Sequence, residues 1–178
     1  MNHEIIMAGF GGQGVMLIGQ LMTYGGMLAQ KQVSWIPSYG PEMRGGTANC
    51  SVIVADEPIG SPIVTEPTAV IAMNLPSLDK FESALLPGGV LIINSSLIVK
   101  KSGRTDITAY YVPANDLAHE LGNAKAANMV MLGALLAATN AVDTEPLLRA
   151  LEKMFAKRPE LLDINKQALQ RGYQHIGR

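Results

Sequence analysis

The chain has a single cysteine, Cys50, among its 178 residues. One thiol cannot form a disulfide within the chain, and it cannot supply the several thiolates that an iron–sulfur cluster or a cysteine-type zinc site needs. Any iron–sulfur cluster with which this protein works must therefore be bound by another chain. Cys50 falls in a predicted strand, where we expect it to pack as a small apolar residue.

The chain also lacks an excess of charge of either sign, because 14 basic residues face 15 acidic ones and the net charge is −1. This balance argues against a nucleic-acid partner and against an anionic membrane surface. No apolar run approaches the roughly 20 residues of a membrane span. The start, MNHEIIMAG, lacks the pattern of a signal peptide. We therefore expect a cytoplasmic protein without membrane contact.

Motifs of common catalytic and metal sites are missing as well. The sequence contains neither the G-x-x-x-x-G-K-S/T of a P-loop nor a G-x-S-x-G nucleophile elbow. The three histidines, His3, His119 and His175, are too far apart for a metal-ligand spacing. We predict no catalytic residue and no metal ligand on this chain.

The sequence does contain a regular alternation of short apolar runs and helical segments. With 178 residues, of which 48% are hydrophobic, it can bury one good core, and we expect a single domain over residues 1–178. The alternation predicts an α/β fold of the three-layer α/β/α, Rossmann-like type. The predicted strands are 3–9, 33–40, 47–55, 69–74, 89–94 and 108–114, and the predicted helices lie within 14–30, 75–89, 115–122, 125–140, 143–158 and 159–177.

The predicted sheet is mixed and mostly parallel. Strands 33–40 and 47–55 should be antiparallel neighbours, because the segment between them is too short for a helical crossover. Pro37 argues against a central position for the first of these strands. At the helix starts, Ser77 and Asn115 are the expected N-caps.

Three glycines near the N-terminus, Gly9, Gly11 and Gly14, satisfy G-x-G-x-x-G between a predicted strand and a predicted helix. Backbone N–H groups at such a helix start can hold a phosphate or another anion. A dinucleotide site also needs an acidic residue for the ribose about 20 residues further on, and the first acid there is Glu42, inside the next turn. The pattern therefore favours a structural or subunit-contact loop over free NAD or FAD binding, with Gln13 suited to hydrogen-bonding a partner or ligand.

A second glycine-rich segment, GPEMRGG, covers residues 40–46. Its glycines and proline predict a tight turn, and Glu42 and Arg44 place opposite charges two residues apart. One interpretation is a surface loop whose ion pair contributes under ~1 kcal/mol. The other is a rigid loop, continued by Gly45, that presents Arg44 and Glu42 to an anionic ligand or a neighbouring chain. The residues alone do not choose between the two.

The two glycine segments together carry a family resemblance. GFGGQGV (9–15) followed by SYGPEMRGGTANCSVIV (38–54) resembles the gamma subunit of the 2-oxoacid:ferredoxin (acceptor) oxidoreductases, most closely that of the 2-oxoglutarate enzyme. The likeness continues through NLPSLDKF, LLPGGVLIINSS and AANMVMLGALL and so covers essentially the whole chain. It implies the fold of domain III of pyruvate:ferredoxin oxidoreductase.

The resemblance also implies a division of labour. In this family the complete enzyme decarboxylates a 2-oxo acid on thiamine diphosphate, passes electrons through 4Fe–4S clusters to ferredoxin, and transfers the acyl group to coenzyme A. A gamma subunit is a non-catalytic component that works with alpha, beta and delta subunits and binds none of these cofactors firmly by itself. The alternatives are the gamma subunit of a pyruvate or other 2-oxo acid enzyme, a scaffold that only holds other chains, and a free-standing dinucleotide-binding domain.

The residues that the resemblance marks as a coenzyme A or subunit contact are those of the two glycine loops. They are Gly9, Gly11, Gly12, Gln13, Gly14, Glu42, Arg44 and Gly45.

The nearly all-apolar helix predicted at 125–140 and the ten methionines suggest exposed apolar patches when the chain is isolated. Asn128, polar at the start of that helix, should either cap it or bond to another chain. We predict that the purified chain self-associates as a symmetric dimer. Sedimentation at micromolar concentration tests this expectation, and a monomer of 19.0 kDa would contradict it.

Overall fold

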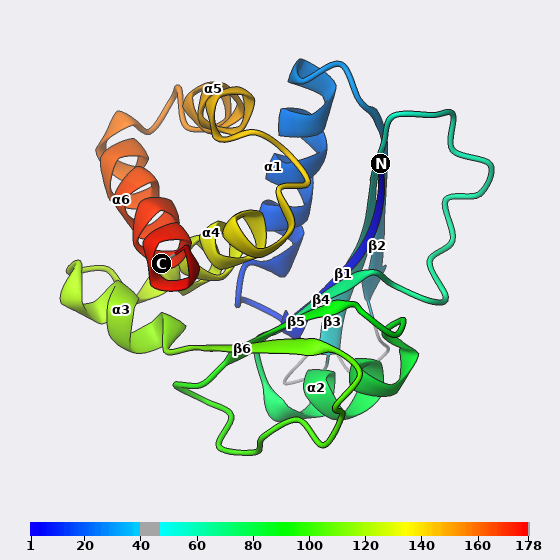
Figure 1. Ribbon diagram of the computed structural model, residues 1–178. Coiled ribbons are helices and arrows are strands. Elements are labelled where there is room, and N and C mark those ends of the chain that lie inside the picture. Colours follow the sequence, from blue (N-terminus) through cyan, green and yellow to red (C-terminus); the bar gives the residue numbers. More distant parts are fainter. Residues whose placement is uncertain (40–46, 178) are drawn as a thin grey trace.

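A six-stranded β-sheet forms the centre of the protein in the computed structural model, which describes residues 1–39 and 47–177 (Figure 1). The strands lie in the order β2-β3-β1-β4-β5-β6. Each forms where the sequence has a short apolar or β-branched run. Their bounds are β1 (Asn2–Phe10), β2 (Gln32–Tyr39), β3 (Thr47–Ala55), β4 (Ala69–Ala72), β5 (Val90–Asn94) and β6 (Thr108–Val112).

The sheet is mixed and mostly parallel, which confirms the prediction. β3 pairs antiparallel with both β1 and β2, whereas β1, β4, β5 and β6 pair in parallel. The predicted antiparallel pairing across residues 40–46 is therefore confirmed. Pro37 lies in β2, an edge strand, and its partner on β3 is Cys50. A residue without an N–H can be tolerated there because one side of the strand has no neighbouring strand in this sheet.

Among the described residues, helices lie between β1 and β2, between β4 and β5, and after β6. They are α1 (Val15–Leu28), α2 (Leu75–Phe81), α3 (Ala114–Glu120), α4 (Ala127–Thr139), α5 (Thr144–Met154) and α6 (Pro159–Ile176), with short 3-10 helices η1 (Glu82–Ala84) and η2 (Ala124–Ala126). Within residues 1–39 and 47–177, no helix combines the length and the apolar character needed to cross a bilayer.

The helices cover the two faces of the sheet unequally (Figure 1). α1 and α4 contact the strands on one face, α5 packs on α1, and α6 packs on α4. α2 lies on the opposite face (Figure 1). The arrangement is the expected three-layer α/β/α fold, with most of the helical mass on one side.

Two hydrophobic cores, one on each face, follow from the alternation of side chains along each strand. On β1, Ile5 and Met7 join the large core under α1 and α4, while Ile6 and Ala8 join the smaller core under α2. All residues of β4 are buried, as expected for a central strand covered on both faces.

Two predicted helix caps are wrong. α2 is capped by Asn74, whose Oδ1 accepts a hydrogen bond of 3.0 Å from the Ser77 N–H. Ser77 lies in the first turn, and its buried Oγ has no hydrogen-bond partner among the described residues. α3 begins one residue before Asn115, and the Asn115 Oδ1 accepts from Asn94 instead. Asn, Ser and Asp are nearly equivalent caps, so propensity could not choose among neighbouring candidates.

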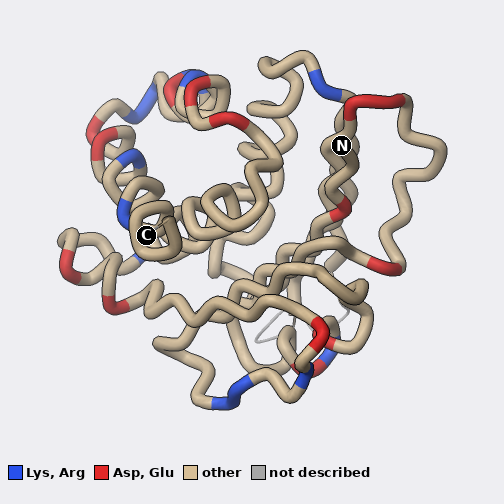
Figure 2. The backbone as a smooth tube through the Cα atoms, viewed as in Figure 1, with Lys and Arg blue, Asp and Glu red and all other residues tan. Residues whose placement is uncertain are grey.

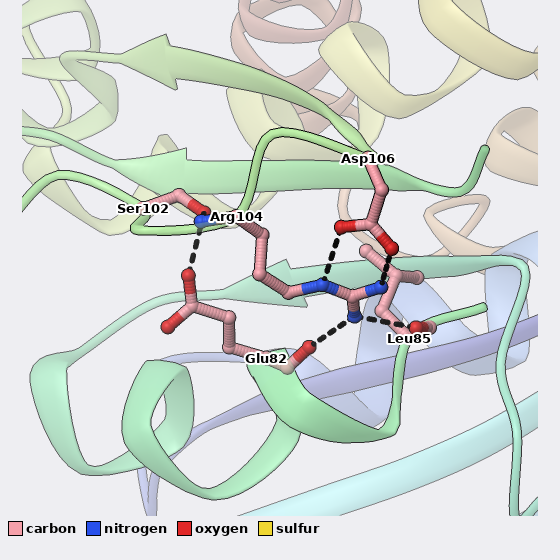
Figure 3. A network of polar contacts seen from close by, with 5 residues as sticks. All are labelled: Glu82, Leu85, Ser102, Arg104 and Asp106. Carbon is pink, nitrogen blue, oxygen red and sulfur yellow. Dashed lines mark hydrogen bonds and ion pairs between the residues drawn. The ribbon is translucent and has the colours of Figure 1, made fainter. Parts of the chain in front are cut away.

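The connection between β5 and β6 contains no helix and is tied down by Arg104 (Figure 3). Its Nη1 donates to the carbonyl oxygens of Glu82 (2.9 Å) and Leu85 (2.5 Å), at the two ends of the η1 turn. Its Nε and Nη2 donate to the two carboxylate oxygens of Asp106, at 2.9 and 2.6 Å. These hydrogen bonds from the guanidinium hold the pKa of Asp106 below its usual value. The fork fastens the connection to the helical segment beside it.

The closest packing in the helical layers is the crossing of α4 and α6. An ideal Cβ added at Gly133 would lie 1.9 Å from the carbonyl oxygen of Leu169, and one at Gly172 would lie 1.8 Å from that of Val130. Each helix therefore presents a glycine to the backbone of the other. α6 thereby covers one side of α4, and all residues from Ala127 to Leu136 are buried between it and the rest of the fold.

We predict that Gly133→Ala destabilises the protein. Alanine raises helix propensity by about 1 kcal/mol, but overpacking costs about 1–3 kcal/mol and more where two backbones must separate. We expect a net loss of about 2 kcal/mol or more in the free energy of unfolding, measured by urea denaturation. Gly103→Ala is the control, because a Cβ there meets nothing within 4 Å. Equal stability of the two variants would contradict the close crossing.

Candidate functional site

The first glycine loop, residues 9–14, joins the carboxyl end of β1 to the start of α1. Gly14 is the N-cap of α1 and has φ +76°, and Gly12 has φ +90°. The Gln13 N–H donates to the Phe10 carbonyl oxygen at 3.1 Å and closes the turn. The glycine pattern thus makes a tight strand-to-helix turn that side chains at both positive-φ residues would strain.

The side chain of Gln13 folds back into this loop. Its Oε1 accepts from the Phe10 N–H at 2.6 Å and from the Asn74 Nδ2 at 3.2 Å. A Cβ at Gly9 would lie 2.7 Å from the same oxygen, so glycine leaves room for the fold-back. The oxygen that the sequence suggested for a partner or ligand is therefore used within the chain, whereas Gly11 and Gly12 are exposed.

Further amides lie beside Gln13, at the carboxyl edge of the parallel strands. Asn74 follows β4, and Asn94 is the last residue of β5. The Asn94 Nδ2 donates to the Met73 carbonyl oxygen (3.2 Å) and to the Asn115 Oδ1 (2.7 Å). Sequence reasoning missed these residues as a group. The signal was present, since both strand-like runs end in asparagine.

Asn128 approaches the loop from α4. Its Nδ2 donates to the Gly14 carbonyl oxygen at 3.2 Å, and its Oδ1 accepts from the Met129 N–H at 2.9 Å. The predicted cap is wrong, because α4 has Ala126 as N-cap without a side-chain cap bond. The bond of Asn128 to the loop lies within the chain, and a bond to another chain stays a prediction. The side chain is 4% exposed.

The loop lies where ligands bind in doubly wound folds. The strand order reverses between β1 and β4, because β2 and β3 lie on one side and β5 and β6 on the other. Ligands of such sheets bind outside the carboxyl ends of the strands at this switch point. Here the hydrogen bond from Asn74 to Gln13 spans the two strand ends. This hydrogen bond between two amide side chains thus links the residues that follow β1 and β4.

The residues before and after the first glycine loop in the sequence carry no charge. No Lys, Arg, Asp or Glu occurs between Glu4 and Lys31. Figure 2 shows the charged residues spread over the outer helices and the connections, while α1 carries none. A phosphate at this loop would therefore be held by backbone N–H groups, unless a cation came from elsewhere.

The second glycine loop covers residues 40–46. Glu42, Arg44 and Gly45 lie outside the described residues. In the sequence, that segment follows β2 and precedes β3. The end of β2 and the end of β1 lie on either side of the start of β3, since Ala48 pairs with both Tyr39 and Gly9.

The remaining candidates are dispersed. His3, His119 and His175 lie on β1, α3 and α6. Within residues 1–39 and 47–177, no group of three or more His, Cys, Asp or Glu side chains could hold a metal ion. Cys50 is fully buried on β3, and burial raises the pKa of its thiol to about 11. The thiol is therefore neutral near pH 7, as expected for a small apolar core residue.

Comparison with known proteins gives a consistent family. The family model for pyruvate ferredoxin/flavodoxin oxidoreductase matches residues 4–175. The ketoisovalerate oxidoreductase subunit VorA of Methanothermobacter thermautotrophicus is 38% identical over 170 residues, which are 95% of this chain and 35% of VorA. The chain therefore spans about a third of the length of that relative.

Two other proteins match from end to end. The 2-oxoglutarate synthase subunit KorC of Methanocaldococcus jannaschii is 34% identical over 177 residues, which are 98% of this chain and 94% of KorC. The crystal structure of a keto/oxoacid ferredoxin oxidoreductase gamma subunit from Geobacter sulfurreducens PCA superposes with a TM-score of 0.83 at 30% identity. That match covers 98% of each chain.

We predict that alanine at Gly14 is more harmful than alanine at Gly12. Both positions have positive φ, so each substitution costs about 1–2 kcal/mol in backbone strain. A Cβ at Gly12 meets nothing within 4 Å, whereas one at Gly14 would lie 2.3 Å from the Asn128 Nδ2. Displacing that buried amide adds about 1–3 kcal/mol. Denaturant unfolding should separate the two variants, and equal losses would contradict the contact with Asn128.

Proposed function

The chain belongs to the pyruvate ferredoxin/flavodoxin oxidoreductase family, and we propose that it is the gamma subunit of a 2-oxoglutarate:ferredoxin oxidoreductase. The observation that carries the proposal is the end-to-end correspondence with KorC, at 98% of this chain and 94% of that one.

The complete enzyme in this proposal oxidatively decarboxylates the 2-oxo acid, conjugates the acyl group to coenzyme A and reduces ferredoxin. Thiamine diphosphate and the 4Fe–4S clusters belong to the alpha, beta and delta subunits. The residues of this chain do not fit a cluster, because its one thiol is buried and neutral. In this proposal the gamma subunit completes the assembly, and the catalytic residues lie on the other subunits.

The part of the chain that we assign to contacts within the complex is formed by the two glycine loops. The first loop exposes the backbone of Gly11 and Gly12 at the fold's switch point, beside an α1 N-terminus without a side-chain cap. Glu42, Arg44 and Gly45 belong to the second loop. The two loops meet coenzyme A or a neighbouring subunit.

The identity of the 2-oxo acid substrate is a separate part of the proposal. A pyruvate or branched-chain 2-oxo acid enzyme is the alternative, favoured by the 38% identity with a ketoisovalerate oxidoreductase subunit. We prefer 2-oxoglutarate because KorC, at 34% identity, is more similar than the pyruvate synthase subunit PorC of Thermotoga maritima, at 31%, which is also matched over nearly its whole length.

The test is a pull-down of the tagged chain from its native extract. We expect thiamine- and iron–sulfur-binding partners, and coenzyme A-dependent reduction of a viologen dye with 2-oxoglutarate exceeding that with pyruvate or 2-oxoisovalerate. Activity with another acid would replace the substrate. Recovery of the chain alone, binding NAD or FAD, would overturn the subunit assignment.

The ligand role of the second loop has its own test. Arg44→Ala in the reconstituted complex should raise the KM for coenzyme A if the guanidinium contacts a phosphate, by roughly tenfold for one lost charge-assisted hydrogen bond. Lys101→Ala, remote from both loops in the sequence, serves as the charge-matched control. An unchanged KM would remove Arg44 from the ligand site.

A further inference from the structure

Two asparagines hold consecutive residues of the first glycine loop from distant parts of the chain. Asn74 donates to the Gln13 side chain, 61 residues away, and Asn128 donates to the Gly14 carbonyl oxygen, 114 residues away. Asn74 is 2% exposed and Asn128 is 4% exposed. The loop is therefore held from both sides, by the starts of α2 and α4.

Asn128 is an unusual residue for its position. It is the one polar side chain in the buried stretch of α4 from Ala127 to Leu136. Burying an amide costs free energy unless its groups are hydrogen-bonded, and an apolar residue would fit the core without that requirement. What the amide provides is a donor to Gly14. Its place in an apolar helix is thus explained by the loop and not by the helix.

Asn74 combines two tasks in one amide. The Oδ1 caps α2 through Ser77, and the Nδ2 donates to Gln13 Oε1. The Gln13 oxygen in turn accepts from the Phe10 N–H. A chain of hydrogen bonds therefore runs from the start of α2 to the backbone of the loop, and it needs the NH₂ group of Asn74 as its link.

We infer that Asn74 and Asn128 are positioning residues that hold the glycine loop in the shape in which it packs against a neighbouring subunit of the oxidoreductase. This inference rests on the proposed function. An uncharged loop with exposed glycine backbone, flanked by a charge-free α1, matches a protein contact, since charged residues are depleted at the centres of interfaces. Holding the loop in advance lowers the ordering cost of association.

The variants separate positioning from folding. Asn74→Asp keeps an excellent cap for α2 but removes the donor to Gln13. Asn128→Leu removes the donor to Gly14 at similar volume. The matched controls are Asn123→Asp, whose side chain caps η2 through the Lys125 N–H, and Asn165→Leu, whose Nδ2 donates to the Leu161 carbonyl oxygen within α6.

The first readout is amide hydrogen exchange in the purified chain. Loss of one hydrogen bond should speed exchange of the Phe10 and Gln13 amides roughly threefold to tenfold in both loop variants. The two controls should leave these amides unchanged. If Asn74→Asp and Asn128→Leu also leave them unchanged, the positioning role is overturned while the proposed function stands.

The second readout is the dissociation constant for assembly with the partner subunits. We expect it to rise by a similar factor in the loop variants and not in the controls. Faster exchange with unchanged assembly, in these variants and in Gly14→Ala, would overturn the contact role of the loop itself. A raised KM for coenzyme A with unchanged assembly would show that the loop contacts coenzyme A, and it would overturn the proposed contact between the loop and a neighbouring subunit.

Discussion

The close crossing of α4 and α6 is the contact on which the candidate site depends. α4 lies between the sheet and α6, and it is buried along its first ten residues. Only a glycine on each helix lets the α6 backbone come near enough to cover it. Asn128 lies in the first turn of α4. The packing of α6 against α4 therefore helps to fix the position and rotation of α4 from which the Asn128 amide reaches the Gly14 carbonyl oxygen. The shape of the loop is in this way a consequence of helix packing.

Much of the fold could be predicted because its signals are local. Short apolar runs placed all six strands, a seven-residue connection required β2 and β3 to be antiparallel, and Pro37 pointed to an edge. The site could not be predicted in the same way. Its bonds join residues 61 and 114 positions apart, and no local pattern states which asparagine meets which glycine. Propensity also failed at the caps, because Asn74 and Ser77 are equally good candidates for α2.

Contacts and backbone angles within the chain account for two glycines of the pattern, Gly9 and Gly14, and for Gly12 beside them. Gly9 leaves room for the Gln13 oxygen, Gly14 leaves room for Asn128, and both Gly12 and Gly14 take positive φ. Each demand comes from the chain itself. A tight strand-to-helix turn needs the same residues whether or not a pyrophosphate lies against it, so G-x-G-x-x-G identifies the turn and not its occupant. In a dinucleotide site the ribose-binding acid is a second and separate requirement, and residues 33–40 contain no acid.

The loop is held by amide hydrogen bonds and not by ion pairs, so its stability should depend less on pH and salt than that of the ion pairs on the rest of the surface. Asp56 is paired with Lys31 and with the N-terminal ammonium, and hydrogen bonding to Lys31 lowers the pKa of its carboxyl to about 2. That pair stabilises the fold above the unfolded pKa of Asp and is lost as the pH falls through about 2. Amide groups do not titrate in this range, and hydrogen bonds between them are screened little by salt. The loop therefore keeps its geometry where peripheral ion pairs weaken, and a salt dependence of assembly would arise from other surfaces of the chain.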